Sequence, residues 1–186
     1  YGVSVVWSEK DSITVVDADG IAHVCHLKSG AGTSQGVFES KDCFSTDNGQ
    51  ACYGLFDLPS DGKGGYTWKN ENEYREDRAY NPMVATGISY SNEMVFNPAG
   101  GIIKLSLKGV GILGKIEVTS SDMRLGGSVK VGEGGNVIVD ASGPKTMTLD
   151  CGKGLELNEN SQETFYLALP EGDYAGLSFS FIGTNG

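Results

Sequence analysis

The residues of this chain best suited to metal or nucleophilic chemistry lie in one short run, His23, Cys25 and His26. Imidazole and thiolate groups bind zinc, but a zinc site needs three or four converging ligands. In an extended strand, His23 and Cys25 would share one face and His26 would point the other way. The sequence contains 2 histidines and no Cys-x-x-Cys pair. We therefore interpret these residues as ordinary strand positions and expect no metal and no cofactor.

Asp17, Asp19 and Gly20 resemble the start of a calcium-binding loop. An EF-hand loop would need a further oxygen ligand two residues after Asp19 and a glutamate at its end. Ile21 and Ala22 break that pattern. Because β-prone residues flank this segment on both sides, we interpret it as the turn of a β-hairpin.

Several carboxylates gather between residues 71 and 77, where a pair held at a fixed separation could hydrolyse a glycosidic bond. Basic residues are interspersed among them, which favours a charge-balanced, solvated surface. The sequence has no Gly-x-Ser-x-Gly nucleophile elbow, and Gly132–Gly135 lacks the lysine of a phosphate-binding loop. We therefore expect no enzymatic activity. The charged residues concerned are Glu71, Glu73, Glu76 and Asp77, with Lys69, Arg75 and Arg78.

Aromatic residues in the same region form the predicted ligand- or partner-binding site, which consists of Tyr66, Trp68, Tyr74 and Tyr80. Asparagine side chains lie among them at positions 70, 72 and 81. Aromatic rings with nearby amides suit sugar rings and protein interfaces alike. The alternative interpretation, which we weight more heavily, is that these rings cap the edge of a sandwich.

The 4 cysteines are Cys25, Cys43, Cys52 and Cys151. Cys43 and Cys52 flank the turn sequence Asp47-Asn48-Gly49 and could form a disulfide across a hairpin. The favoured alternative is that all the cysteines are small apolar residues in or near the core.

Composition narrows the classes of partner. The net charge of −10 argues against nucleic acid and against anionic lipid, since both attract lysine and arginine. No run approaches the 18 apolar residues of a membrane-spanning helix. The chain begins at Tyr1 without methionine, so we expect a processed protein or a piece of a longer one.

Strand signals dominate the chain and recur every 10 to 15 residues, with 28 glycines but only 5 prolines. Ile103, Leu105 and Leu107 alternate with polar residues, as do Phe165, Leu167 and Leu169. Pro170–Asp173 is interpreted as the turn of a last hairpin, in which the strand that contains Phe165 pairs with a strand that contains Leu177, Phe179 and Phe181. Residues 60–82 are expected to form a long polar loop, in which 71–78 could form one or two helical turns. The predicted fold is all-β, an antiparallel β-sandwich with few or no long helices.

The order of several motifs resembles the fimbrillin-like family of Bacteroidetes, which contains major and minor pilins and surface adhesin lipoproteins. Each motif by itself is weak, but together they span nearly the whole chain. The motifs are Trp7–Ile13 before a β-branched strand, Gly30–Phe38, Cys52–Pro59, Gly101–Gly109, Lys115–Val118 and the segment Phe165–Tyr174.

This resemblance implies a transthyretin-like, Greek-key sandwich in a single domain over residues 1–186, as the N-terminal domain or a fragment of a longer protein. It also implies export to the cell surface or outer membrane, with any lipid anchor outside this chain. The implied role is that of a pilus subunit or adhesin that binds other pilin subunits by strand exchange. Surface glycans or proteins of host or bacterial cells are further implied partners. The alternative function is a carbohydrate-binding module of a surface glycan-binding lipoprotein.

Overall fold

The computed structural model describes residues 5–17, 19–42, 53–61, 65–86 and 93–184. These residues form an all-β protein in which the only helical element is a single 3-10 turn, η1 (Glu133–Gly135). The predicted fold class is therefore confirmed. Within the described ranges, no helix is long and apolar enough to cross a membrane.

The chain divides into two compact units, residues 1–57 with 83–97 and residues 58–82 with 98–186. Each unit has a hydrophobic cluster of its own. The single domain predicted over residues 1–186 stays a prediction.

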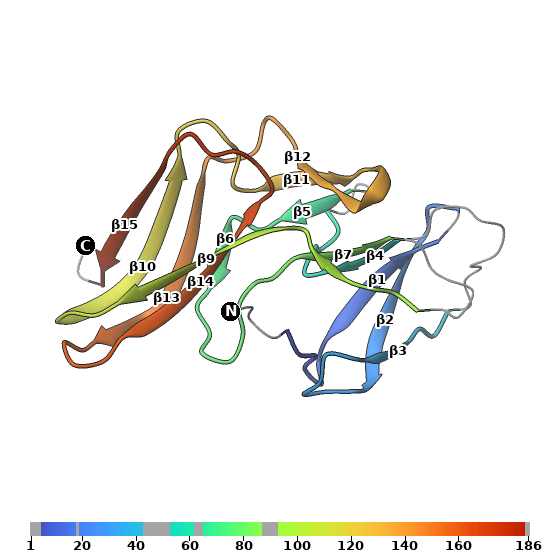
Figure 1. The fold of residues 1–186 in the computed structure, drawn as a ribbon, viewed down its shortest axis with the longest axis horizontal. Helices are drawn as coiled ribbons and strands as arrows, with labels where there is room; N and C mark the ends of the chain where they lie inside the picture. Colours follow the sequence, from blue (N-terminus) through green and yellow to red (C-terminus); the bar gives the residue numbers. More distant parts are fainter. Residues whose placement is uncertain (1–4, 18, 43–52, 62–64, 87–92, 185–186) are drawn as a thin grey trace. The chain divides into compact units, whose positions relative to one another are not determined.

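One sheet organises the first unit (Figure 1). The predicted first hairpin is confirmed, since β1 (Ser12–Val16) and β2 (Ala22–Ser29) pair antiparallel with Val15 opposite His23. Along β2 the side chains alternate between exposed and buried, so that His23 and Cys25 face inward and His26 outward, as predicted. In spatial order the strands are β3 (Val37–Glu39), β2 (Ala22–Ser29), β1 (Ser12–Val16), β4 (Tyr53–Phe56), β7 (Met83–Thr86) and β8 (Asn97–Pro98).

The core of the first unit is built around Trp7. The indole contacts three phenylalanine rings edge-on, with centroid separations of 4.9 Å to Phe38, 5.1 Å to Phe56 and 5.7 Å to Phe96. Edge-to-face aromatic contacts of this kind add to the stabilisation from burial alone. Ile13, Val15, Cys25, Phe56 and Met83 complete the buried cluster.

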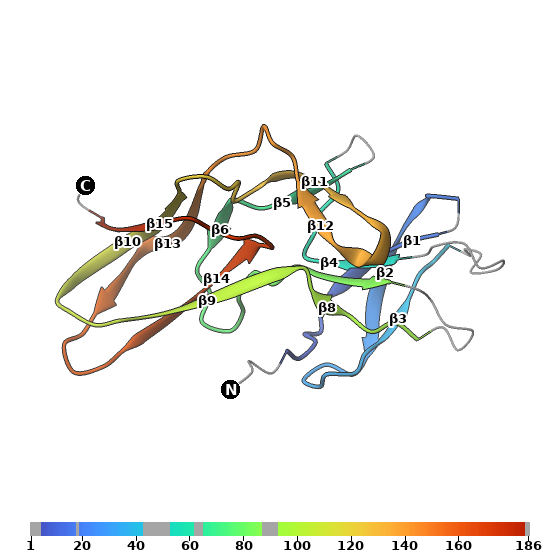
Figure 2. The same ribbon diagram turned by 45° about the horizontal axis from the view of Figure 1, so that its top comes forward.

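The second unit contains three sheets (Figure 2). A four-stranded sheet faces a two-stranded one, because a single buried cluster takes residues from β10 (Gly111–Ser120) and β13 (Thr146–Leu157) of the first and from β14 (Glu163–Pro170) of the second. The four-stranded sheet has the order β15 (Leu177–Gly183), β10 (Gly111–Ser120), β13 (Thr146–Leu157) and β6 (Glu71–Glu73). The other sheets are β14 (Glu163–Pro170) with β9 (Gly100–Leu107), and β12 (Val137–Val139), β11 (Gly127–Val131) and β5 (Tyr66–Trp68).

The predicted last hairpin is wrong. Phe165, Leu167 and Leu169 lie on β14, which pairs with β9, whereas β15 pairs with β10 in the facing sheet. β14 and β15 each carry apolar side chains on one face, and these two faces pack on the same core. With the strands in opposite layers, Phe165 is buried in the core cluster and Phe179 packs against it, half-buried, and the segment 171–176 connects the two layers.

The prediction of a polar loop over residues 60–82 is corrected, because strands lie within this range. Tyr66–Trp68 forms β5 and pairs antiparallel with β11. Glu71–Glu73 forms β6 and pairs in parallel with β13, so the helical turn considered over 71–78 does not begin there. Tertiary pairing overrides the polar local composition, which is why composition misidentified this segment.

Candidate functional site

The four aromatic residues of the predicted binding site occupy different environments. Trp68 is fully buried and Tyr66 is 8% exposed. Both side chains point into the protein from β5, which is held between β11 and a bridge from Ser60 to Tyr66. The indole Nε1 of Trp68 is buried and has no hydrogen-bond partner among the described residues.

The structure brings Tyr80 to Trp68 but places Tyr74 elsewhere. The rings of Tyr80 and Trp68 meet edge-on with centroids 6.1 Å apart. The backbone N–H of Lys69 donates to the Tyr80 hydroxyl at 3.0 Å, and the Lys69 ammonium lies 5.4 Å from the Tyr80 ring centroid. Tyr74 instead packs on Phe165 of β14, with centroids 5.0 Å apart.

This arrangement resembles a packed edge more than a binding platform. A sugar-stacking site needs an exposed aromatic face, and in the described structure neither Trp68 nor Tyr66 offers one. Tyr74 and Tyr80 are half-buried, and each packs against a neighbouring aromatic ring. A binding role for the four residues stays a prediction.

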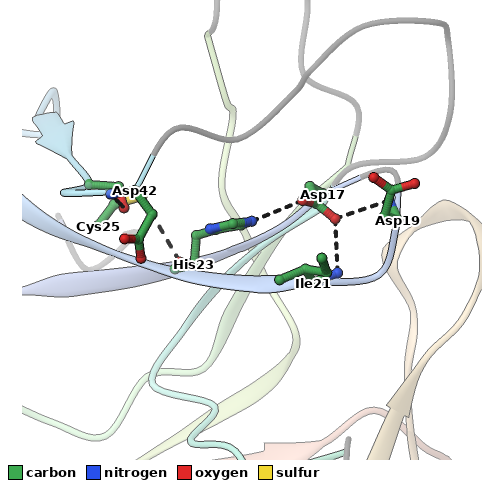
Figure 3. Close-up of polar contacts among 7 residues, drawn as sticks. Asp17, Asp19, Ile21, His23, Cys25 and Asp42 are labelled. Atoms are coloured by element: carbon green, nitrogen blue, oxygen red, sulfur yellow. Dashed lines mark hydrogen bonds and ion pairs between the residues drawn. The ribbon is translucent and has the colours of Figure 1, made fainter.

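A second cluster surrounds the first hairpin turn (Figure 3). The carboxylate of Asp17 lies 2.9 Å from His23 Nε2 and accepts hydrogen bonds from the backbone N–H groups of Ile21, at 2.8 Å, and Asp19, at 3.0 Å. The bonds to His23 and Ile21 lower the pKa of Asp17 below its usual value. Asp17 and His23 are both buried polar residues. The carboxylate therefore closes the turn and satisfies a buried imidazole.

Cys25 does not complete a catalytic set with this pair. Its sulfur lies 4.0 Å from the His23 carbonyl oxygen rather than beside the imidazole ring. Burial raises the pKa of the Cys25 thiol, whereas a nucleophilic cysteine needs its pKa lowered. No group of three or more metal-ligating side chains occurs among the described residues. Cys43 and Cys52, with the disulfide considered between them, lie outside the described residues.

The feature with the clearest capacity for binding is the edge of the two-stranded sheet. The core-facing side chains of β14 are sealed, with Phe165 at 0%, Leu167 at 2% and Leu169 at 4% exposure. Those of β9 belong to the same core but are only half-buried at Ile103 and Leu105. In the described structure β9 pairs with β14 alone. One edge of β9 thus presents unpaired backbone groups beside incompletely covered apolar side chains.

The sequence predicted which side chains of β9 face the core, but not that β9 lies at the edge of its sheet. The alternation of Ile103, Leu105 and Leu107 identifies which side chains point inward. Which strands lie beside β9 depends on residues distant in the sequence, and no local pattern encodes this. The Asp17–His23 contact was also missed, although the hairpin register offers a signal. Asp17 lies opposite Ile21, which places His23 diagonally across on the same face.

Comparisons of this chain with models of known protein families, with curated proteins and with solved structures find no match.

Proposed function

We propose that this chain is a non-enzymatic, fimbrillin-like cell-surface protein, a pilus subunit or adhesin, which assembles by accepting a β-strand from a neighbouring subunit. The observation that carries the proposal is the edge of β9. The core-facing side chains of β9 are only half-buried, whereas those of β14 are almost fully buried. The family resemblance of the sequence motifs is a second support.

The physical argument concerns what an added strand would gain. The free edge of β9 offers N–H and C=O groups that a donated strand would satisfy. Alternate side chains of that strand would point to the core and cover Ile103, Leu105 and Leu107. Burying apolar area yields roughly 25 cal/mol per Å². A strand with alternating apolar residues is therefore the partner that this edge fits.

The proposed location is the outer surface of the cell, with other subunits of the filament as principal partners. A protein of this kind needs no cofactor. Glycans or proteins on the surfaces of other cells remain the proposed receptors of an adhesin.

The test is immunogold electron microscopy combined with photo-crosslinking in cells that make the full protein. A photo-reactive phenylalanine analogue replaces Ser106, which is exposed on β9. A strand added beside β9 would lie about 5 Å away. We expect label along filaments and, after irradiation, a ladder of covalent multimers of this protein.

Thr119 provides the matched control. It is exposed on β10, but Thr146 and Ser178 already flank it on both sides. The same analogue at this position should give no ladder. Label spread over the envelope without filaments, together with no product from position 106, would overturn the proposal.

A further inference from the structure

We infer that a second edge, that of β15, pairs antiparallel with β15 of a second copy of this chain. The two four-stranded sheets would then join into one continuous sheet across a two-fold axis at Ser180. This inference concerns β15, whereas the strand-accepting edge proposed above belongs to β9. The inference does not depend on that proposal.

The starting observation is that β15 ends its sheet. It pairs with β10 along its whole length, from Leu177 opposite Ser120 to Gly183 opposite Leu113, and with no other strand in the described ranges. Every second residue of β15 therefore directs its backbone N–H and C=O groups away from the sheet. Such a row is a template for another strand.

The composition of β15 sets it apart from the other edge strands. Natural edges are usually short or carry a charge or a proline that discourages pairing. β15 is 7 residues long and reads Leu-Ser-Phe-Ser-Phe-Ile-Gly, without a charge or a proline. Segments of this length, uncharged and rich in β-prone residues, pair readily with copies of themselves.

The other sheet ends carry the usual protection. β3 is 3 residues long and ends at Glu39, which pairs with Lys28. β6 reads Glu-Asn-Glu, and β8 has 2 residues, one of them Pro98. β5 and β12 have 3 residues each. β14 begins at Glu163 and ends at Pro170. β9 is the exception, since it is the edge at which we propose that a donated strand adds, and its one charged residue is Lys104.

The strand is also complementary to itself. Two antiparallel copies pair residues whose numbers have a constant sum, and a sum of 360 is the register that pairs the whole of Leu177–Gly183. In this register Phe179 of each copy lies opposite Phe181 of the other, and Ser180 lies opposite itself. Residues paired this way share a face of the sheet, so the phenylalanines stay on the core side and the serines on the outer side.

The exposure of Phe181 indicates what the second copy would cover. Phe181 lies opposite Ile116, which is fully buried, yet Phe181 itself is 49% exposed. A phenylalanine from the second copy beside it would cover part of that ring, and cross-strand aromatic pairs stabilise sheets. Because the chain carries a net charge of −10, two copies approach most easily along a strand that carries no charge.

Disulfide trapping tests both the contact and its register in the full chain. In the predicted dimer the two Ser180 Cα atoms lie about 4.5 to 5.5 Å apart, which a disulfide can span. We expect Ser180→Cys to form a covalent dimer under mild oxidation. Peptide mapping under non-reducing conditions would show position 180 joined to position 180, which excludes linkage through the native cysteines.

The matched control is Ser178→Cys, another exposed serine on the same face of β15. It would lie opposite Ile182, and its own counterpart would be about four residues away along the strand, roughly 13 Å. This variant should not form the 178–178 dimer. Equal cross-linking of both variants would indicate random collision and would overturn the inference.

Sedimentation equilibrium on the purified chain provides the second measurement. We expect a reversible dimer, and Phe181→Lys should raise its dissociation constant by about tenfold or more, because a lysine on an edge strand opposes pairing. Ile138→Lys, at another exposed apolar position in a different sheet (57% exposed), should leave the dimer unchanged. Circular dichroism would confirm that both variants are folded. A wild-type chain that stays monomeric at every concentration would overturn the inference.

Discussion

At the scale of single residues, hydrogen bonds made by polar side chains hold the turns of both units, by the buried Asp17 in the first and by the half-buried Tyr174 and the exposed Asp122 in the second. In the second unit the Tyr174 hydroxyl donates to the Pro170 carbonyl oxygen at 2.6 Å, while the ring packs against the core cluster. The Asp122 carboxylate accepts from the Ala175 N–H at 3.1 Å. Together these bonds hold the segment that carries the chain from β14 to β15. Burial, and secondarily the negative charge of Asp122, raise the pKa of Tyr174 to about 12.

Replacing Tyr174 with phenylalanine should reveal both the contribution of its hydrogen bond to stability and the consequence of its raised pKa. At neutral pH we expect Tyr174→Phe to cost about 0.5 to 1.5 kcal/mol of unfolding free energy, the usual value of one hydrogen bond. Because the folded pKa is raised, the tyrosine contributes fully below about pH 10 and loses its contribution as pH rises towards 12. The difference between the proteins should therefore shrink above pH 10, as measured by urea unfolding. In an ultraviolet titration, the transition near pH 12 should disappear; its persistence would contradict the assignment.

Asp17 should behave in the opposite sense with pH. Its folded pKa is lowered, so its contribution is present above the unfolded pKa of about 3.9 and is lost as pH falls through the folded value. We expect Asp17→Asn to lower the melting temperature at neutral pH, with a difference from wild type that narrows below about pH 4.

Asp19→Asn makes the same change of charge at an exposed position of the same turn and is the control. Thermal scans at several pH values should show little effect of this variant at any pH. A difference for Asp17→Asn that stays constant down to acid pH would contradict a role for the ionised carboxylate.

At the scale of elements, the pairing of β9 with β14 depends on close approach at one glycine. A Cβ atom at Gly100 would press into the Leu169 carbonyl oxygen and would lie 2.8 Å from Trp68 Cη2. A Cβ atom at Gly101 would meet nothing within 4 Å. Neighbouring glycines of one strand therefore have different roles, and the first lets β9 begin against β14 and the buried indole.

We expect Gly100→Ala to destabilise the protein by about 1 to 3 kcal/mol, as overpacking does. Gly101→Ala should change the free energy of unfolding by no more than about 0.5 kcal/mol. Urea denaturation with tryptophan fluorescence would measure both. Equal effects of the two substitutions would argue against close packing at the start of β9.

At the scale of the whole molecule, charge opposes association while the strand edges favour it. The chain carries 24 acidic and 14 basic residues, so two copies repel each other. β15 and the core-facing row of β9 are uncharged surfaces within this acidic protein. Any contact made along them should therefore strengthen when the repulsion is screened.

Adding salt should accordingly tighten the β15 dimer several-fold between low and high ionic strength, because the Debye length falls from about 30 Å at 0.01 M to about 10 Å at 0.1 M. Sedimentation equilibrium over a series of sodium chloride concentrations would measure this. Phe181→Lys should remain dissociated throughout the series. A dimer that weakens with salt would instead indicate attraction between opposite charges and would contradict pairing along β15.

The features that could be predicted from the sequence are local ones. The alternation of apolar residues identified the inward faces around Leu105 and Leu167, and the turn after Asp17 identified the first hairpin. These follow from the period of a strand and from turn chemistry, which neighbouring residues encode.

Which strands pair and which edges stay open follows from the fold of the whole chain and not from any one segment. β15 pairs with β10 and not with β14, and Glu71–Glu73 pairs with β13 in a sheet. Trp68 is buried, although the composition of its segment predicted a polar loop. Strand pairing joins residues far apart in the chain, and its free energy depends on how completely a shared core is covered. No pattern within a single segment contains that information, and the open edges of β9 and β15 follow from it.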